Sequence, residues 1–105
     1  MRKLSDNDGH GLAIWALTSG GARLAKKIAA RLPAAELLFS EKEASCHRRC
    51  YTFMRLVPEV AHRFHQYSTH LFIMSTGIVV RAIAPLLKNK TMDPGVVVAD
   101  EAGCH

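Results

Sequence analysis

The fold is decided by the stretch Leu12-Ala13-Ile14-Trp15-Ala16-Leu17-Thr18-Ser19-Gly20-Gly21, in which an apolar run passes directly into small polar residues. A short, continuous apolar run is typical of a strand that is buried on both faces, as in parallel sheets. The small residues after it predict a tight turn in which a Ser or Thr oxygen caps a helix. That helix is predicted over residues 22–32, where an apolar residue recurs at every fourth position and Pro33 ends the pattern.

The same unit of strand, turn and helix recurs along the chain. Further strands are predicted at residues 36–39, 70–74 and 96–99, further helices at 55–66 and 78–88, and a loop at 40–51. Pro85 predicts a kink in the last helix or a new first turn. The apolar stripes of the two later helices are predicted to face inward: Val57, Val60, Ala61 and Phe64 on one, and Val79, Ala82, Ile83, Leu86 and Leu87 on the other.

This alternation predicts one α/β domain over residues 12–105, preceded by a flexible tail over residues 1–11. The expected architecture has three layers: an open, mostly parallel sheet of about four strands, with helices on both faces.

In sheets of this kind the ligand site lies beyond the carboxyl ends of the strands. That edge is expected to hold Thr18, Ser19, Gly20 and Gly21 after the first strand, and Ser75, Thr76 and Gly77 after the third. Backbone N–H groups at a helix start bind carboxylate or phosphate, although a plain capped turn uses the same groups.

Three charged residues belong to the same predicted edge. Arg81 lies one turn past Gly77 and is expected either to pair with a bound carboxylate or to be an exposed helix arginine. Asp100 and Glu101 follow the last strand, where a carboxylate either acts as a general base on water or is a solvated loop acid.

Composition restricts the classes of partner. The chain has 105 residues, 49% of them hydrophobic, and a net charge of +5, which favours anionic partners or simply aids solubility. Its basic residues are scattered and lack interleaved aromatics, so nucleic acid is not expected. The apolar runs are too short to span a membrane, and no targeting signal is visible. Three cysteines, an odd number, argue against a secreted disulfide framework and favour a reducing cytoplasm.

No metal site is expected. Cys46, His47 and Cys50 form a C-x-x-x-C pattern that Cys104 and His105 would have to complete, but a second ligand pair at zinc spacing is missing. His62 and His65 share the polar face of one helix and are interpreted as solvated.

Several stretches of the sequence also resemble a known protein family. The block FIMSTGIVVRAIAPLLK at 72–88 resembles the hallmark of the cobalt-precorrin 5A hydrolase family (CbiG type). KTMDPGVVVADEAG at 90–103, IWALTSGG at 14–21 and HQY at 65–67 are similar to that family as well, so the likeness spans about residues 12–103.

The resemblance implies a role in anaerobic cobalamin biosynthesis. Members of the family hydrolyse the δ-lactone of cobalt-precorrin 5A, and a ring carbon then leaves as acetaldehyde to give cobalt-precorrin 5B. The implied partner is an anionic cobalt-tetrapyrrole, and no separate cofactor is expected because the substrate carries the cobalt. In the family the turn at 100–103 continues into another strand, so we expect a domain that is incomplete at its C-terminus, with an exposed sheet edge that favours self-association.

Other functions are compatible with the same sequence. One is a non-catalytic tetrapyrrole-binding or interaction module. Another is a flavodoxin-like phosphate or nucleotide binder, which the fold permits although a specific phosphate motif is missing. A third is an inert fragment.

Overall fold

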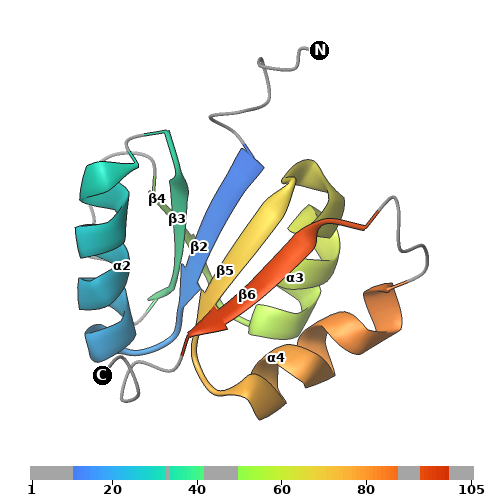
Figure 1. Ribbon diagram of the computed structural model, residues 1–105. Helices are drawn as coiled ribbons and strands as arrows, with labels where there is room; N and C mark the ends of the chain where they lie inside the picture. Colours follow the sequence, from blue (N-terminus) through green and yellow to red (C-terminus); the bar gives the residue numbers. More distant parts are fainter. Residues whose placement is uncertain (1–10, 33, 42–49, 88–92, 100–105) are drawn as a thin grey trace, which may run out of the picture.

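The computed structural model describes residues 11–32, 34–41, 50–87 and 93–99 (Figure 1). The strands are β2 (Leu12–Ala16), β3 (Glu36–Ser40), β4 (Cys50–Phe53), β5 (Thr69–Ile73) and β6 (Gly95–Ala99). The helices are α2 (Ser19–Arg31), α3 (Leu56–Arg63) and α4 (Thr76–Ile83), and the 3-10 turns η3 (Phe64–Gln66) and η4 (Ala84–Leu86) extend the last two.

All five strands join one parallel sheet in the order β4-β3-β2-β5-β6. The predicted α/β class is confirmed, with five strands in place of about four. The added strand is β4, whose first two residues had been assigned to a loop. Its short run Cys50-Tyr51-Thr52-Phe53 is half exposed, so it lacks the continuous apolar character of the central strands. Pairing with β3 from Leu37↔Cys50 to Ser40↔Phe53 makes it a strand.

The helices lie on both faces of the sheet, which confirms the three layers (Figure 1). On one face, α2 buries Ala22 and Ala25 against Ile14, Phe39 and their neighbours. On the other face, α3 and α4 enclose a larger core; its fully buried members include Trp15, Leu38, Val60, Phe64 and Phe72.

The apolar stripes of α3 and α4 are partly different from those predicted. Val60 and Phe64 are buried as expected, but Val57 is 49% exposed and Ala61 is exposed, because α3 faces the sheet along the line Leu56, Val60, Phe64. Leu87 is also 49% exposed, since the backbone is already extended there, beyond η4.

Pro85 begins a new turn, one of the two outcomes expected. It lies at the start of η4, where a missing backbone N–H costs no hydrogen bond.

A buried polar network links the two central strands, β2 and β5. His70 is fully buried. Trp15 Nε1 donates to His70 Nδ1 at 2.9 Å, and His70 Nε2 lies 2.8 Å from the carbonyl oxygen of Phe64. Because the indole N–H is a donor only, Nδ1 must accept, so the ring is the neutral tautomer that donates from Nε2.

A second hydrogen bond joins Tyr67 to β3: the Tyr67 hydroxyl donates to Glu36 Oε1 at 2.5 Å. Burial, helped by this carboxylate, raises the pKa of Tyr67.

Within the described residues, every helix is too short or too polar to cross a membrane.

Candidate functional site

The carboxyl ends of β2 and β5 mark the point where the chain changes direction across the sheet. From β2 the chain passes through α2 to β3 on one side, and from β5 it passes through α4 to β6 on the other. Ala16 and Ile73, the last residues of the two strands, pair directly with each other. In open α/β sheets, such a switch point forms a crevice that binds ligands.

Thr18 caps the helix on the β2 side of this crevice. Its backbone is extended, and its Oγ1 accepts a hydrogen bond from the N–H of Gly21 at 3.1 Å. The predicted cap is therefore confirmed. The N–H groups of Ser19 and Gly20, at the first two helical positions, have no acceptor within the helix. The first turn of α2 contains no acidic side chain, so the positive end of the helix dipole is not offset locally.

Gly21 lets α2 approach the two strands closely. A Cβ atom built on Gly21 would lie 3.1 Å from the carbonyl oxygen of Ile73 and 3.4 Å from the Cβ of Ala16. The first turn of α2 therefore lies directly against the ends of both β2 and β5. Gly21 is thus needed for packing and is itself buried.

The start of α4 on the β5 side is more open. Ser75 is the N-cap residue, but its side chain makes no capping hydrogen bond, whereas the Thr18 side chain does. Ser75, Thr76 and Gly77 are all exposed, and a Cβ on Gly77 would meet no atom within 4 Å. The first turn of α4 is free of acidic residues too. This segment therefore offers hydroxyl and N–H groups to the solvent beside the crevice.

Arg81 lies one helical turn past Gly77, on the same exposed side of α4. Val79 and Ala82 face the core on the other side. Arg81 is thus an exposed helix arginine near the first turn of α4.

Asp100 and Glu101 lie outside the described residues. The structure does place the strand that leads to them, because Ala99 at the end of β6 pairs with Ile73. The carboxyl end of β6 therefore shares the edge formed by β2 and β5.

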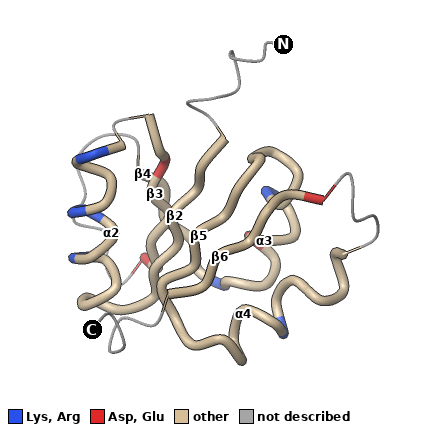
Figure 2. The backbone as a smooth tube through the Cα atoms, viewed as in Figure 1, with Lys and Arg blue, Asp and Glu red and all other residues tan. Residues whose placement is uncertain are grey.

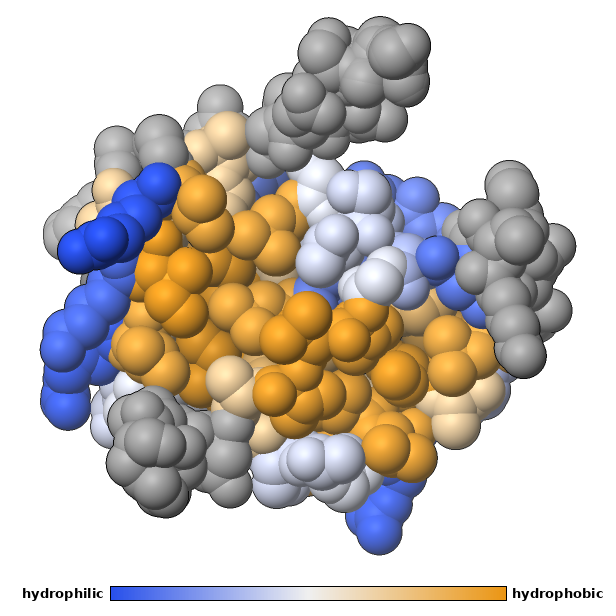
Figure 3. All heavy atoms as spheres, viewed as in Figure 1, coloured by the Kyte–Doolittle hydropathy of each residue, from blue (hydrophilic) through white to orange (hydrophobic). Residues whose placement is uncertain are grey.

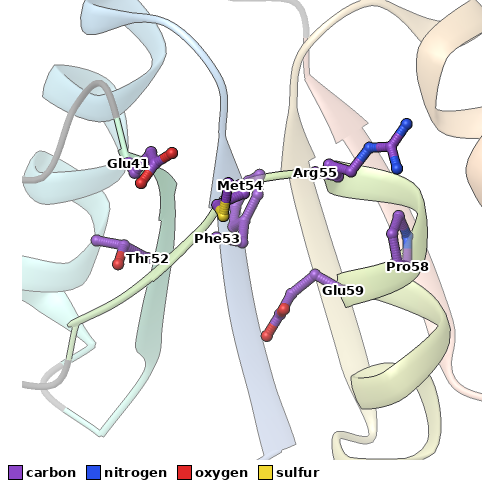
Figure 4. Close-up of a pocket in the computed structure, with 7 residues that line it drawn as sticks. All are labelled: Glu41, Thr52, Phe53, Met54, Arg55, Pro58 and Glu59. Carbon is purple, nitrogen blue, oxygen red and sulfur yellow. The ribbon is translucent and has the colours of Figure 1, made fainter.

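Sequence reasoning missed a hollow of about 380 Å³ at the same edge, beyond β3 and β4 (Figure 4). It is lined by Glu41, Thr52, Phe53, Met54, Arg55, Pro58 and Glu59. Arg55 precedes α3 and makes no side-chain cap, and Met54 beside it is 79% exposed. Glu59 is ion-paired with Arg63 at 2.6 Å. The hollow thus combines an apolar wall with an exposed cation and two carboxylates.

The hollow was missed because β4 was not recognised as a strand. The available signal was the β-branched and aromatic run Tyr51-Thr52-Phe53, which favours a strand and ends just before α3.

Of the five residues in the metal alternative, only Cys50 is among the described residues. Its sulfur forms a disulfide and is therefore not available as a metal ligand. Cys46, His47, Cys104 and His105 lie outside the described residues. Among the residues that are described, no three His, Cys, Asp or Glu side chains gather as a metal site would require. His62 and His65 are both exposed on α3 and η3, and His65 Nε2 lies 3.3 Å from Asp93.

Comparison with known proteins gives two clear relatives. The sequence model of the family described as "Cobalamin synthesis G N-terminal" matches residues 59–105. The cobalt-precorrin-5A hydrolase of Salmonella typhimurium (strain LT2) is 36% identical over 106 residues, covering 90% of this chain and 26% of that protein. The protein of the same name from Priestia megaterium is 31% identical over 98 residues, covering 87% of this chain and 25% of that protein. No solved structure matches significantly.

These findings confirm the resemblance that the sequence motifs indicated. The chain spans about a quarter of the length of the curated relatives it matches.

Proposed function

We propose that this chain, which is similar to the N-terminal region of cobalt-precorrin-5A hydrolases, binds the tetrapyrrole substrate of that family. The reaction adds water across the δ-lactone of cobalt-precorrin 5A and breaks its ring ester bond. The redundant ring carbon then leaves as acetaldehyde, giving cobalt-precorrin 5B. The cobalt is part of the substrate, so the proposal includes no cofactor bound by the protein itself.

The observation that carries this proposal is the pair of helix starts at the switch point between β2 and β5. Substrates of this class carry acetate and propionate groups around a flat ring. Helix starts that lack acidic residues stabilise such carboxylates through N–H groups and the helix dipole. In the proposal, Ser19, Gly20 and Gly21 form one carboxylate contact with the capping Thr18, and Ser75, Thr76 and Gly77 form the other.

The hollow beside β4 supports the same class of ligand. Phe53, Met54 and Pro58 offer apolar surface to a flat ring, and Arg55 offers a cation to a carboxylate on its rim. Arg81, one turn past Gly77 on the exposed side of α4, is proposed to pair with a substrate carboxylate held at the start of that helix.

For the catalytic step, we propose residues in the turn that follows β6. In the proposal, Asp100 or Glu101 orients the attacking water, because both follow a strand that ends at the crevice.

A second candidate is a non-catalytic module that binds the tetrapyrrole or a partner. The specific observation in its favour is that the described residues supply ligand contacts, at the helix starts and in the hollow, which bind without breaking a bond.

Anaerobic incubation of the chain with cobalt-precorrin 5A tests both candidates. We expect a change in the corrinoid spectrum on binding, and acetaldehyde release if the chain carries the catalytic groups. A spectral change without acetaldehyde would favour the binding module. An unchanged spectrum would contradict tetrapyrrole binding in either candidate.

Two matched pairs of substitutions test the assignment of the site. Ser75→Ala is expected to weaken binding, whereas Ser68→Ala, at the opposite end of β5, is expected to leave it unchanged. Arg55→Gln should weaken binding more than Arg31→Gln, since Arg31 lies in the last turn of α2 and away from the hollow. Equal effects within either pair would show that the crevice or the hollow is not the binding site.

A further inference from the structure

β6 is an edge strand without the features that protect such edges. It pairs with β5 on one side, and among the described strands no other lies beside it. Natural edge strands are protected by charged side chains, prolines or bulges. The strand itself, Gly95-Val96-Val97-Val98-Ala99, has no charged residue and no proline.

The backbone groups on the free side of β6 can be identified from its pairing with β5. Gly95 donates its N–H to the carbonyl of Ser68 at 2.9 Å, so Gly95 points toward β5. Successive residues of a strand point their backbone groups to opposite sides, so Val97 and Ala99 also point toward β5. The N–H and C=O groups of Val96 and Val98 therefore point away from the sheet.

These outward groups are complementary to those of a second copy. If two β6 strands meet antiparallel about a two-fold axis at Val97, then Val96 of one copy lies opposite Val98 of the other. Such an opposed pair exchanges both N–H···O=C bonds, and the symmetry repeats the exchange. Val97 then faces Val97 of the second copy at the closely spaced position between the two pairs.

The side chains agree with this register. Val97 is 52% exposed, while Val96 and Val98 on the other face are packed against the core beneath α3 and α4. α2 covers β2 and β3 but not β6. Figure 3 shows apolar side chains gathered on this open face, over β2, β5 and β6. Pairing of two β6 strands would therefore bring two exposed valines together beside a continuous apolar surface.

The distribution of charge also permits the β6 strands of two copies to come together. The basic residues of α2 lie at the far side of the molecule from β6, and the tube along β6 is free of charge (Figure 2). Two copies that meet at β6 therefore keep their most basic helices apart, which limits the repulsion between two chains of net charge +5.

The opposite edge, β4, is less suited to the same contact. It has only four residues, and the guanidinium of Arg63 lies over the ring of its Tyr51, 4.6 Å from the ring centre.

We propose that the chain self-associates through β6, forming a two-fold dimer in which the two sheets join as one with Val97 on the axis. A contact centred on one short strand from each copy is smaller than the roughly 1,200–2,000 Å² of stable specific interfaces. The dimer is therefore weak and depends on concentration.

Sedimentation equilibrium over a wide concentration range tests the proposal with a matched pair of variants. Val97→Lys places like charges opposite each other on the axis and is expected to weaken association about tenfold or more. Val80→Lys is the control, because Val80 is 53% exposed but lies on α4. It should associate as the unaltered chain does. Circular dichroism establishes that both variants fold.

Amide hydrogen exchange gives a second readout. The amides of Val96 and Val98 should be unprotected in dilute solution and become protected as the concentration rises. The proposal is overturned by a chain that stays monomeric at all concentrations. A dimer that Val97→Lys leaves unchanged, or one in which both amides stay unprotected, overturns it as well.

Discussion

Acidification should destabilise this fold through one buried side chain, His70. The imidazole is fully buried, and both of its nitrogens are engaged, one accepting from Trp15 and one donating to Phe64. A second proton on the ring would point at the indole N–H, which cannot accept it. Burial accordingly lowers the pKa of His70 below its ordinary value of 6.5.

Proton linkage gives the direction in which stability changes with pH. Below about pH 6.5 the unfolded chain binds a proton at His70 that the folded chain does not, so stability is present above that pH and falls as the solution is acidified. Between pH 6.5 and pH 5, a histidine that stays neutral in the folded state lowers the stability by at most about 1.4 kcal/mol per pH unit. For a domain of this size, a loss of about 1.4 kcal/mol lowers Tm by about 8 °C.

Thermal or urea unfolding across this pH range measures the effect. His70→Gln is the informative variant, because a glutamine amide supplies one acceptor and one donor but does not titrate. We expect it to flatten the profile between about pH 5 and pH 6.5, above the range in which carboxylates titrate. His62→Gln, at an exposed position on α3, should keep the original slope. Equal slopes in the unaltered chain and in His70→Gln would refute the reasoning.

Four further predictions concern stability and can be measured by urea unfolding. Thr18→Ala should cost about 1 kcal/mol because it removes a cap, whereas Ser75→Ala, at an N-cap without a side-chain hydrogen bond, should cost little. Gly21→Ala should destabilise by about 1 kcal/mol or more, because the new methyl group crowds a backbone carbonyl. Gly77→Ala should stabilise by about 0.5–1 kcal/mol, because the helix has open space there. Tyr67→Phe should cost about 1–3 kcal/mol, because it removes the hydrogen bond that the Tyr67 hydroxyl donates to a carboxylate oxygen of Glu36.

The features that the sequence predicted correctly are those set by neighbouring residues. The strand at β2, the cap at Thr18 and the new turn at Pro85 each depend on a few consecutive residues. The position of Ser75 at the same sheet edge as Thr18 followed from the alternation of strands and helices, because parallel strands place their carboxyl ends together.

The features that were missed depend on contacts between distant segments. Pairing with β3 makes β4 a strand, and the exposure of Val57 depends on how α3 is rotated against the sheet. The hydrogen bond between Trp15 and His70 joins residues 55 positions apart, and no local pattern in the sequence signals it.

The polar groups of the central strand pair are used in two different ways. Between the strands, Trp15 of β2, His70 of β5 and the carbonyl of Phe64 satisfy one another in a fully buried network. Such a network costs free energy when any member is lost, so it fixes β2 against β5 in a single register. At the carboxyl ends of the same two strands, the Ser75 side chain is left out of the cap and the first N–H groups of α2 have no acceptor in the helix. A rigid strand pair that ends in available donors favours the binding of a carboxylate-rich ligand. The donors are already in position before the ligand arrives, so less conformational entropy is lost on binding.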